Sequence, residues 1–534
     1  MNGISRNTVK LKNGITHLKP VKGQIIIFTN AFEWPDFPNR LVAIIKRNYI
    51  MLRRFWPIAL NENKKFTTHF LVVSILSLVA QFTSAQQALP TRQQIQWHEM
   101  EFYLFIHFGP NTFTNKEWGL GDEPENVFNP TELDCRQWAR IAKAAGAKGI
   151  IITAKHHDGF CLWPSKYSTH TVRESKWKDG QGDVLRDLSK ACREFGLRFG
   201  VYISPWDRNH PKYGTEEYND VYVNTMTEVV KNYGPLFEMW WDGANGEGPN
   251  GKKQVYDFHR FENTMRKLAP NTIIFSDIGP DCRWVGNEKG IAGKTNWNYL
   301  DTAGFKRGAG GPPEKSLNEG NEKGKNYIPS ECDVSIRPGW FYHTEEDDKV
   351  KSAEQLFDLY LKSVGRGSNL LLNVPPDRRG LINENDSAAL MEFKKLRDES
   401  FKDNLAKNAR AYWQFSLNDL PGKDVVIKSF QNSEGYTINV QQFSVEFDDP
   451  TRINCIGLYE YLQNGQTIRQ FRIELYNGNK KLRTLDATTV GRKRVLTFPA
   501  ETITSFKVYL DDKNGGDNIR AVTAYLIDEK LTEK

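Results

Sequence analysis

The stretch GIIITAKHHDGF, residues 149–160, is an apolar run that ends abruptly in charged and imidazole side chains. An amphipathic helical pattern, VLRDLSKACREFG at 184–196, separates it from a second apolar run, LRFGVYISPW at 197–206. Strands that are apolar throughout and alternate with helices form parallel sheets that are covered on both faces. The same alternation extends outward in both directions, which predicts a parallel α/β fold.

About seven or eight apolar runs fall between residues 97 and 377, and this number favours a closed (β/α)₈-type barrel over an open sheet. The first of them, EFYLFIHFG at 101–109, is not followed by the glycine fingerprint of a dinucleotide-binding fold. We therefore expect an α/β barrel at residues 86–400.

The sequence period changes beyond about residue 405. Runs such as RQFRIELYN at 469–477 and SFKVYLDD at 505–512 are rich in β-formers, and NG-containing turns separate them. Closely spaced strands without helices indicate a β-sandwich. We expect this C-terminal β-sandwich to occupy residues 401–534.

The formal net charge of +7 belongs to the leader rather than to the body of the chain. The first 85 residues hold 12 of the 72 basic and 3 of the 65 acidic residues, so the remaining 60 basic and 62 acidic residues leave a net charge of −2. A near-neutral body lacks the basic excess that is typical of nucleic-acid binding, so we expect no nucleic-acid partner.

The leader has the build of a secretory signal. Basic residues precede the eleven-residue apolar run FLVVSILSLVA at 70–80, and small residues suitable for cleavage follow it up to Ala85. Such a run is too short to span a bilayer but suits the apolar region of a signal peptide. We expect a signal peptide at 51–85 and an upstream extension or start-site artefact at 1–50. We also expect export to the periplasm or beyond, with no membrane contact after cleavage; a membrane anchor is the alternative.

Cysteine usage gives no zinc pattern. The exported part holds six cysteines without a CxxC pair, and a chain of this size does not depend on disulfides. We expect mostly free, buried thiols and leave a single bridge open. They are Cys135, Cys161, Cys192, Cys282, Cys332 and Cys455.

The active site of a (β/α)₈ barrel forms at the carboxyl ends of its strands, so polar residues that close apolar runs are the candidates. Imidazoles, tryptophans and carboxylates gathered at one mouth suit a sugar, whose hydroxyls need directional partners and whose C–H faces stack on aromatic rings. Each residue also has a structural alternative: a histidine can be a core residue, a tryptophan can be packing, and an aspartate can form a turn. The candidates are His107, Lys155, His156, His157, Asp158, Tyr202, Ser204, Trp206, Asp242 and Asp277.

Hydrolysis of a glycosidic bond needs two carboxyl groups, which lie about 5–5.5 Å apart in retaining enzymes. Asp242 follows the fourth predicted strand, and Glu288 lies in the loop GPDCRWVGNEKG (279–290) after the fifth. We expect the two to come from neighbouring strands, which makes such a separation feasible. Trp240 and Trp241 precede Asp242, and which of them faces the substrate is left open.

Five ordered motifs resemble glycoside hydrolase family 29, the α-L-fucosidases. They are HFGPNTF with EWG (107–119), KHHDGFCLWPS (155–165), VYISPWDRN (201–209), FEMWWDGANGEG (237–248) and RWVGNEKG (283–290). The resemblance covers about residues 97–377 and implies a (β/α)₈-like barrel followed by a β-sandwich. It also implies hydrolysis with retention of configuration, a fucosylated oligosaccharide or glycoconjugate as substrate, and neither metal nor cofactor.

The resemblance implies roles for individual residues. It makes Asp242 the nucleophile and Glu288 the acid/base residue, and it makes His107, His156, His157, Trp118, Tyr202 and Trp340 contacts of the fucose, with Trp206 a further candidate. Glu288 in the motif RWVGNE resembles the branch that is selective for α-1,3/1,4-linked fucose on branched, Lewis-type glycans and acts poorly on aryl fucosides.

The C-terminal part resembles a discoidin-type carbohydrate-binding module, and we favour a buttress for the barrel over a working sugar site. Two other functions remain open. One is a metal-dependent barrel hydrolase built on His156, His157 and Asp158, although it lacks the His-x-His that such sites often place after the first strand. The other is a non-catalytic glycan-binding protein. The oligomeric state is not indicated.

Overall fold

The computed structural model of the protein describes residues 87–413, 425–427, 442–513 and 519–532. The expected signal peptide and upstream extension lie outside the described residues, as does part of the expected β-sandwich. Across the described ranges, no helix is both long and apolar enough to cross a membrane.

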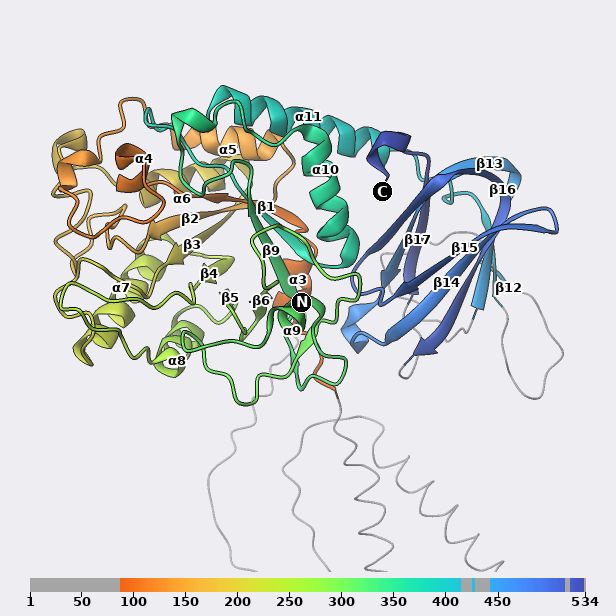
Figure 1. Ribbon diagram of the computed structural model, residues 1–534, viewed down its shortest axis with the longest axis horizontal. Coiled ribbons are helices and arrows are strands. Elements are labelled where there is room, and N and C mark those ends of the chain that lie inside the picture. The colour runs from red at the N-terminus through yellow and green to blue at the C-terminus, as the bar shows by residue number, and fades with distance from the viewer. Residues whose placement is uncertain (1–86, 414–424, 428–441, 514–518, 533–534) are drawn as a thin grey trace, which may run out of the picture. The chain divides into compact units, whose positions relative to one another are not determined.

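Eight parallel strands close into a barrel, which confirms the predicted (β/α)₈-type fold (Figure 1). The ring closes where the first strand pairs with the last, and the strand order around it is β1-β10-β9-β6-β5-β4-β3-β2. The strands are β1 (Phe102–Ile106), β2 (Gly149–Lys155), β3 (Arg198–Ile203), β4 (Glu238–Trp240), β5 (Ile273–Ser276), β6 (Cys282–Trp284), β9 (Ser330–Ser335) and β10 (Asn369–Asn373).

Helices surround the barrel on its outer side (Figure 1). Four of them follow the first four strands, and two follow β9 and β10. They are α5 (Cys135–Ala144), α6 (Val184–Phe195), α7 (Glu217–Tyr233), α8 (Phe258–Leu268), α10 (Ala353–Lys362) and α11 (Glu384–Ser400). Outside this ring lie α3 (Arg92–His98), α4 (Pro110–Thr114), α9 (Glu314–Glu319) and the short strand pair β7 (Tyr299–Leu300) and β8 (Asn326–Tyr327).

Residues 277–281 alone join β5 to β6, with no helix between them. The stretch that carries Glu288 was expected to be a plain loop after the fifth strand, but it contains β6. Glu288 therefore follows the sixth strand, and β5 lies between β4 and β6. The expectation that Asp242 and Glu288 come from neighbouring strands is therefore wrong. The sequence did not reveal β6, because a strand of three residues is too short to give a periodic signal.

Two buried carboxyl groups, Glu238 of β4 and Glu331 of β9, lie close together inside the barrel. The indole N–H of Trp97 donates to Glu238 over 2.8 Å, and that of Trp240 donates to Glu331 over 2.9 Å. Burial is the main cause that raises the pKa of Glu238 well above its ordinary value, and the charge of the neighbouring Glu331 is the second. Burial also raises the pKa of Glu331, to about 7. The pair therefore retains a proton near neutral pH. Through its hydrogen bond with Glu331, the pair also fixes the position of the Trp240 ring.

Trp240 and Trp241 point to opposite sides of the barrel wall. The Trp240 ring stacks on Phe275 inside the barrel, with centroids 4.0 Å apart. Trp241 is fully buried against Phe258 and Phe261 of α8. Trp240 is thus the one on the side of the barrel mouth.

The C-terminal domain is an antiparallel sheet structure with its own hydrophobic core. Its two longest strands, β13 and β16, pair with each other along most of their length, and the register shifts part-way. Side chains from both halves of these strands enter one core, as in a sandwich. The strands are β11 (Arg410–Trp413), β12 (Val425–Ile427), β13 (Gln442–Glu460), β14 (Ile468–Asn477), β15 (Lys480–Thr488), β16 (Arg494–Lys513) and β17 (Ile519–Tyr525). All six cysteines are buried free thiols.

Ion pairs, formed by buried and partly exposed side chains, join this domain to the amino end of the barrel. Glu101, directly before β1, forms ion pairs with Arg492 and with Lys493, whose Nζ lies 3.1 Å from the carboxylate. Glu99 forms ion pairs with Arg492 at 3.0 Å and Arg520 at 2.7 Å. Burial raises the pKa of Glu101, but Lys493 and Arg492 outweigh burial and hold it well below its ordinary value.

Glu101→Gln is expected to lower the free energy of unfolding by about 3 kcal/mol at pH 7, because it leaves buried Lys493 without its carboxylate and removes one of the two carboxylates that pair with Arg492. The stabilisation exists above the ordinary glutamate pKa of about 4.3 and is lost as the pH falls further, since the folded-state pKa is depressed. Denaturant unfolding at pH 7 and at pH 3 should therefore show a gap between wild type and variant that narrows in acid.

Glu99→Gln is the matched control, because that side chain is 43% exposed. It should lose at most about 1 kcal/mol. Equal losses in the two variants, or a gap that is unchanged at pH 3, would contradict a buried ionic clamp.

Candidate active site

Asp242 lies just beyond the end of β4, at the carboxyl-end mouth of the barrel. Its Oδ1 accepts a hydrogen bond from the backbone N–H of Ala244 over 2.7 Å, which is the turn-forming contact that the sequence also suggested. Its Oδ2 accepts from the Tyr202 hydroxyl over 2.8 Å and lies 3.7 Å from Nε2 of His157. The side chain is 24% exposed, so the carboxylate is held in place yet reachable.

Tyr202 stays a hydrogen-bond donor at every pH of interest. Burial, followed by the charge of Asp242, raises the pKa of this phenol well above 10. Its ring lies between His156 and Trp240, with centroids 5.8 and 5.2 Å away. The barrel wall thus fixes the hydroxyl that orients Asp242.

Three histidines form one edge of the same mouth. The ring centroids of His107 and His156 are 5.7 Å apart, and those of His156 and His157 are 4.2 Å apart. Nδ1 of His107 bonds to Oδ1 of Asn373 over 2.8 Å, and Nδ1 of His157 bonds to Oγ of Ser204 over 2.8 Å. Although His156 and His157 are adjacent in sequence, both reach the mouth because they lie past the end of β2.

All three histidines are neutral at physiological pH. Burial lowers the pKa of His107 to about 3 and that of His157 to about 4, although Asp242 opposes the shift at His157. Burial, followed by His157 and His107, lowers the pKa of His156 well below its ordinary value. A neutral imidazole offers one N–H and one lone pair, which together match a sugar hydroxyl.

One nitrogen in this cluster is unsatisfied. Nδ1 of His156 is buried and has no hydrogen-bond partner within the described chain. A buried polar atom without a partner is uncommon in a folded protein and is expected where a ligand supplies the missing bond. This nitrogen is free to bond a ligand at the mouth, although buried polar atoms without a partner, such as Nε1 of Trp241, also occur elsewhere in the described chain.

Tryptophans surround the opening. Trp206 lies 4.8 Å from His157 by ring centroids and donates its indole N–H to the backbone oxygen of Glu247 over 3.1 Å. Trp118 meets both His157 and Trp206 edge-on at 5.6 Å and is 56% exposed. Trp340 lies 5.0 Å from His107.

Glu288 lies at this rim, where it is hydrogen-bonded to Trp340. The indole N–H of Trp340 donates to Oε2 of Glu288 over 3.3 Å, and Glu288 is exposed. The structure therefore connects all of the site residues expected from the sequence: His107, Trp118, His156, His157, Tyr202, Trp206, Asp242, Glu288 and Trp340.

Asn373, Phe341 and Glu117 also belong to the site, although they were not among the expected residues. Asn373 ends the apolar run of β10 and accepts from His107, so the same strand-end criterion could have found it. Phe341 packs edge-on against His107 and His156. Glu117 accepts from the backbone N–H of Trp340 over 2.7 Å, a contact between distant loops for which the sequence gives no signal.

The residues of the alternative metal site point to different partners. Asp158 accepts from the side chain of Asn111 over 3.1 Å and from the backbone of Phe160 over 2.7 Å, whereas His157 bonds to Ser204. In the part of the chain that the structure describes, no group of three His, Cys, Asp or Glu side chains has the arrangement of a metal site. Nothing in this geometry favours the metal-dependent alternative.

A further carboxyl group, Asp277, lies beside the turn of Asp242. A Cβ on Gly243 would lie 2.0 Å from Oδ2 of Asp277, so a larger residue after Asp242 would displace that carboxyl group. Burial, followed by the charge of Asp242, raises the pKa of Asp277 to about 7. The two carboxyl groups thus share a site in which one of them is protonated over most of the acidic range.

Comparison with known proteins places these residues in context. A family model described as "Alpha-L-fucosidase" matches residues 68–396. The chain is 40% identical to "Alpha-L-fucosidase 1" of Arabidopsis thaliana over 82% of this chain and 88% of that protein.

Two solved structures are also similar. A glycoside hydrolase 29 family member from an unknown rumen bacterium is 39% identical, with a TM-score of 0.74 over 84% of this chain and 78% of that chain. A fucosidase of the same family from Ruminococcus gnavus, solved in complex with fucose, is 28% identical, with a TM-score of 0.72 over 84% of this chain and 96% of that chain.

Asp277→Asn is expected to gain stability relative to wild type as the pH rises from 5 to 8. The folded protein holds a proton on Asp277 that the unfolded chain releases near pH 3.9, so wild-type stability decreases as the pH rises toward 7. The amide keeps the shape but cannot ionise. Between pH 5 and 8 the effect is at most about 2.6 kcal/mol, and melting temperatures across this pH range measure it. A difference in melting temperature that does not change with pH would contradict a buried, protonated Asp277.

Proposed function

Because this chain belongs to glycoside hydrolase family 29, the α-L-fucosidases, we propose that it is a retaining enzyme that releases terminal α-1,3/1,4-linked L-fucose from branched glycans. The observation that carries the proposal is Asp242, held by Tyr202 beside His157 at the barrel mouth. Such an anchored carboxylate has the features of a nucleophile that must approach one carbon atom from one direction.

In the first step, Asp242 attacks C1 of the fucose while the bond to the leaving oxygen breaks and Glu288 gives that oxygen a proton. In the second step, Glu288 takes a proton from water, the water oxygen bonds to C1, and Asp242 departs as a carboxylate. The hydrogen bonds from Tyr202 and Ala244 stabilise Asp242 whenever it carries its negative charge.

The neutral histidines suit the sugar rather than the acid–base steps. Their pKa values lie too low for proton transfer near neutrality, so His107, His156 and His157 are proposed to bind fucose hydroxyls. The unpartnered Nδ1 of His156 is the clearest of these contacts. Because the imidazoles carry no charge, they leave the negative charge of Asp242 unopposed for attack.

The open rim supports the proposed preference for a branched substrate. Trp118 is 56% exposed beside the histidines, and Glu288 is exposed beside Trp340. The branched remainder of a glycan substrate would contact this rim, whereas the aryl group of an aryl fucoside is too small to contact most of it. Binding of the remote part of a substrate can be used to lower the barrier at the reacting bond.

We further infer that the protein is exported, on the basis of the leader described above. The apolar run at 70–80 and the small residues up to Ala85 support cleavage by a signal peptidase. The mature enzyme would then meet its glycans in the periplasm or outside the cell.

Asp242→Gly should lower the turnover of α-L-fucosyl fluoride at least about a thousandfold, or about 4 kcal/mol. Added azide should restore turnover and give β-L-fucosyl azide, because azide takes the place of the carboxylate in a single displacement. Nuclear magnetic resonance of the product identifies the anomer. Near wild-type activity, or an α-azide product, would exclude Asp242 as the nucleophile.

Glu288→Ala is the companion test. Its covalent intermediate should form from the fluoride and then accumulate, since no base activates water. Azide should attack that intermediate and give α-L-fucosyl azide, the opposite anomer from that of Asp242→Gly. If azide does not accelerate this variant, the acid/base residue is another carboxylate.

The linkage preference predicts a kcat/KM at least about 100-fold higher for trisaccharides with α-1,3- or α-1,4-linked fucose than for 4-nitrophenyl α-L-fucoside, a barrier difference of about 2.7 kcal/mol. Release of fucose, measured by chromatography, covers both substrates. The Trp118→Ala variant should lose activity mainly on the trisaccharides. Comparable values for the aryl fucoside, or a preference for α-1,2-linked fucose, would contradict the proposed specificity.

A further inference from the structure

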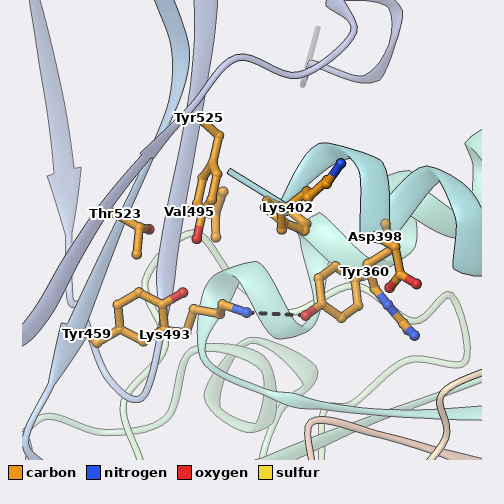
Figure 2. A pocket seen from close by; sticks show the side chains of 10 residues that line it. Tyr360, Asp398, Lys402, Tyr459, Lys493, Val495, Thr523 and Tyr525 are labelled. Atoms are coloured by element: carbon orange, nitrogen blue, oxygen red, sulfur yellow. Dashed lines mark hydrogen bonds between the residues drawn. The ribbon is translucent and has the colours of Figure 1, made fainter. Parts of the chain in front are cut away.

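A cavity of about 390 Å³ lies where the end of α11 and the residues after it meet the C-terminal sheet. Figure 2 shows Tyr459, Thr523 and Tyr525 of the sheet domain across from Tyr360 of α10 and Lys402, which follows α11. This volume falls in the range of small-ligand sites and has room for one or two sugar rings.

The lining is aromatic and polar rather than aliphatic. Three tyrosines and Thr523 contribute rings and hydroxyl groups, and among the described residues of the wall Val495 alone is aliphatic. The hydroxyl of Tyr360 is already occupied, because it donates to Glu101 over 2.7 Å. Tyr459 of β13 lies beneath Lys493 and Arg520, and Tyr525 of β17 is 9% exposed and meets Phe401 edge-on with ring centroids 5.2 Å apart. The hydroxyl groups of this lining match the hydroxyl groups of a sugar.

The charge around the cavity is positive. Lys493 enters it from the sheet domain, and its Nζ lies 3.2 Å from the Tyr360 hydroxyl (Figure 2). The clamp to which Lys493 belongs contains three cations, Arg492, Lys493 and Arg520, against the two carboxylates of Glu99 and Glu101.

Lys402 adds a further positive charge at the rim. Within the described chain, its ammonium group makes neither an ion pair nor a hydrogen bond. The one carboxylate of the wall, Asp398, is paired with Lys394. An exposed cation beside aromatic rings favours a ligand that carries an acidic group.

The cavity cannot be part of the fucose site. Lys493 contacts Glu101, which directly precedes β1, so the cavity lies toward the amino ends of the barrel strands. Asp242 and the three histidines lie at the carboxyl ends. A ligand in the cavity would therefore be held at a distance from the reacting bond.

We propose that this cavity is a second, non-catalytic binding site for an acidic saccharide, a sugar that carries a carboxylate. The hydroxyl group of Tyr459 bonds a hydroxyl of the sugar, and Lys402 at the rim pairs with the carboxylate. The site is independent of the proposed fucosidase mechanism, and it would keep the enzyme on a glycan that presents acidic residues beside fucose.

The direct test compares D-galacturonic acid with D-galactose, which differ only in the carboxylate at C6. Each sugar is titrated into the full protein by isothermal calorimetry, with L-fucose present at saturation to occupy the active site. Galacturonic acid is expected to bind in the millimolar range, and galactose about fivefold or more weakly. Raising the salt concentration should weaken the binding of the acid but leave that of galactose unchanged.

Three variants locate the site. Lys402→Gln should reduce galacturonic acid binding about fivefold, to the level of galactose, and Tyr459→Phe should weaken both sugars. Lys407→Gln is the matched control, since Lys407 is exposed but outside the lining, and it should change nothing. Release of fucose should be unchanged in Lys402→Gln.

Equal binding of the two sugars, no binding of either, or the same loss in Lys402→Gln and Lys407→Gln would overturn the proposal. Because these outcomes concern binding with the active site filled, they do not depend on whether Asp242 is the nucleophile. A failure of the mechanism and a failure of this second site are therefore distinguishable.

Discussion

Parallel hydrogen bonding between β1 and β10 closes eight strands into a ring, and the arrangement of the mouth depends on that closure. Asn373 is paired with Phe105 across this seam. Its side chain accepts from His107 after β1 and donates to Ser335 at the end of β9 and to the backbone of Trp340. One amide at the seam thus links His107 to the loop that carries Trp340. If the strands were open, no single residue could join these segments.

Burial then determines the charge of the mouth. It keeps His107, His156 and His157 neutral and keeps Tyr202 protonated, so Asp242 stands among hydrogen-bond donors and not among full positive charges. Beneath them, the buried Glu238 and Glu331 share the floor of the barrel with Trp240. Neutral hydrogen-bonding groups around one anchored carboxylate suit the neutral sugar of the proposed function.

The sequence predicts the barrel, the antiparallel C-terminal domain and a mouth rich in histidine and tryptophan, because unbroken apolar runs with polar ends are strong local signals. It does not predict β6 or β9. β6 has only three residues and lies within a glycine-containing stretch. β9 contains the polar residues Ser330, Glu331 and Asp333, which are buried and therefore interrupt the apolar pattern of a buried strand. Because β6 was not predicted, Glu288 was expected after the fifth strand, whereas it follows the sixth. The contacts of Glu117 with the Trp340 loop and of Glu101 with Lys493 join residues far apart in the chain, and no local pattern encodes them.

The central claim is that Asp242 forms a covalent bond to fucose. Treatment with 2-deoxy-2-fluoro-α-L-fucosyl fluoride tests it most directly, because fluorine at C2 slows both steps while the fluoride leaving group keeps the first step accessible. Peptide mass spectrometry of the trapped protein should place one fluorofucosyl group on Asp242. A label on Glu288 or Asp277, or an enzyme that turns over without any trapped intermediate, would contradict the claim.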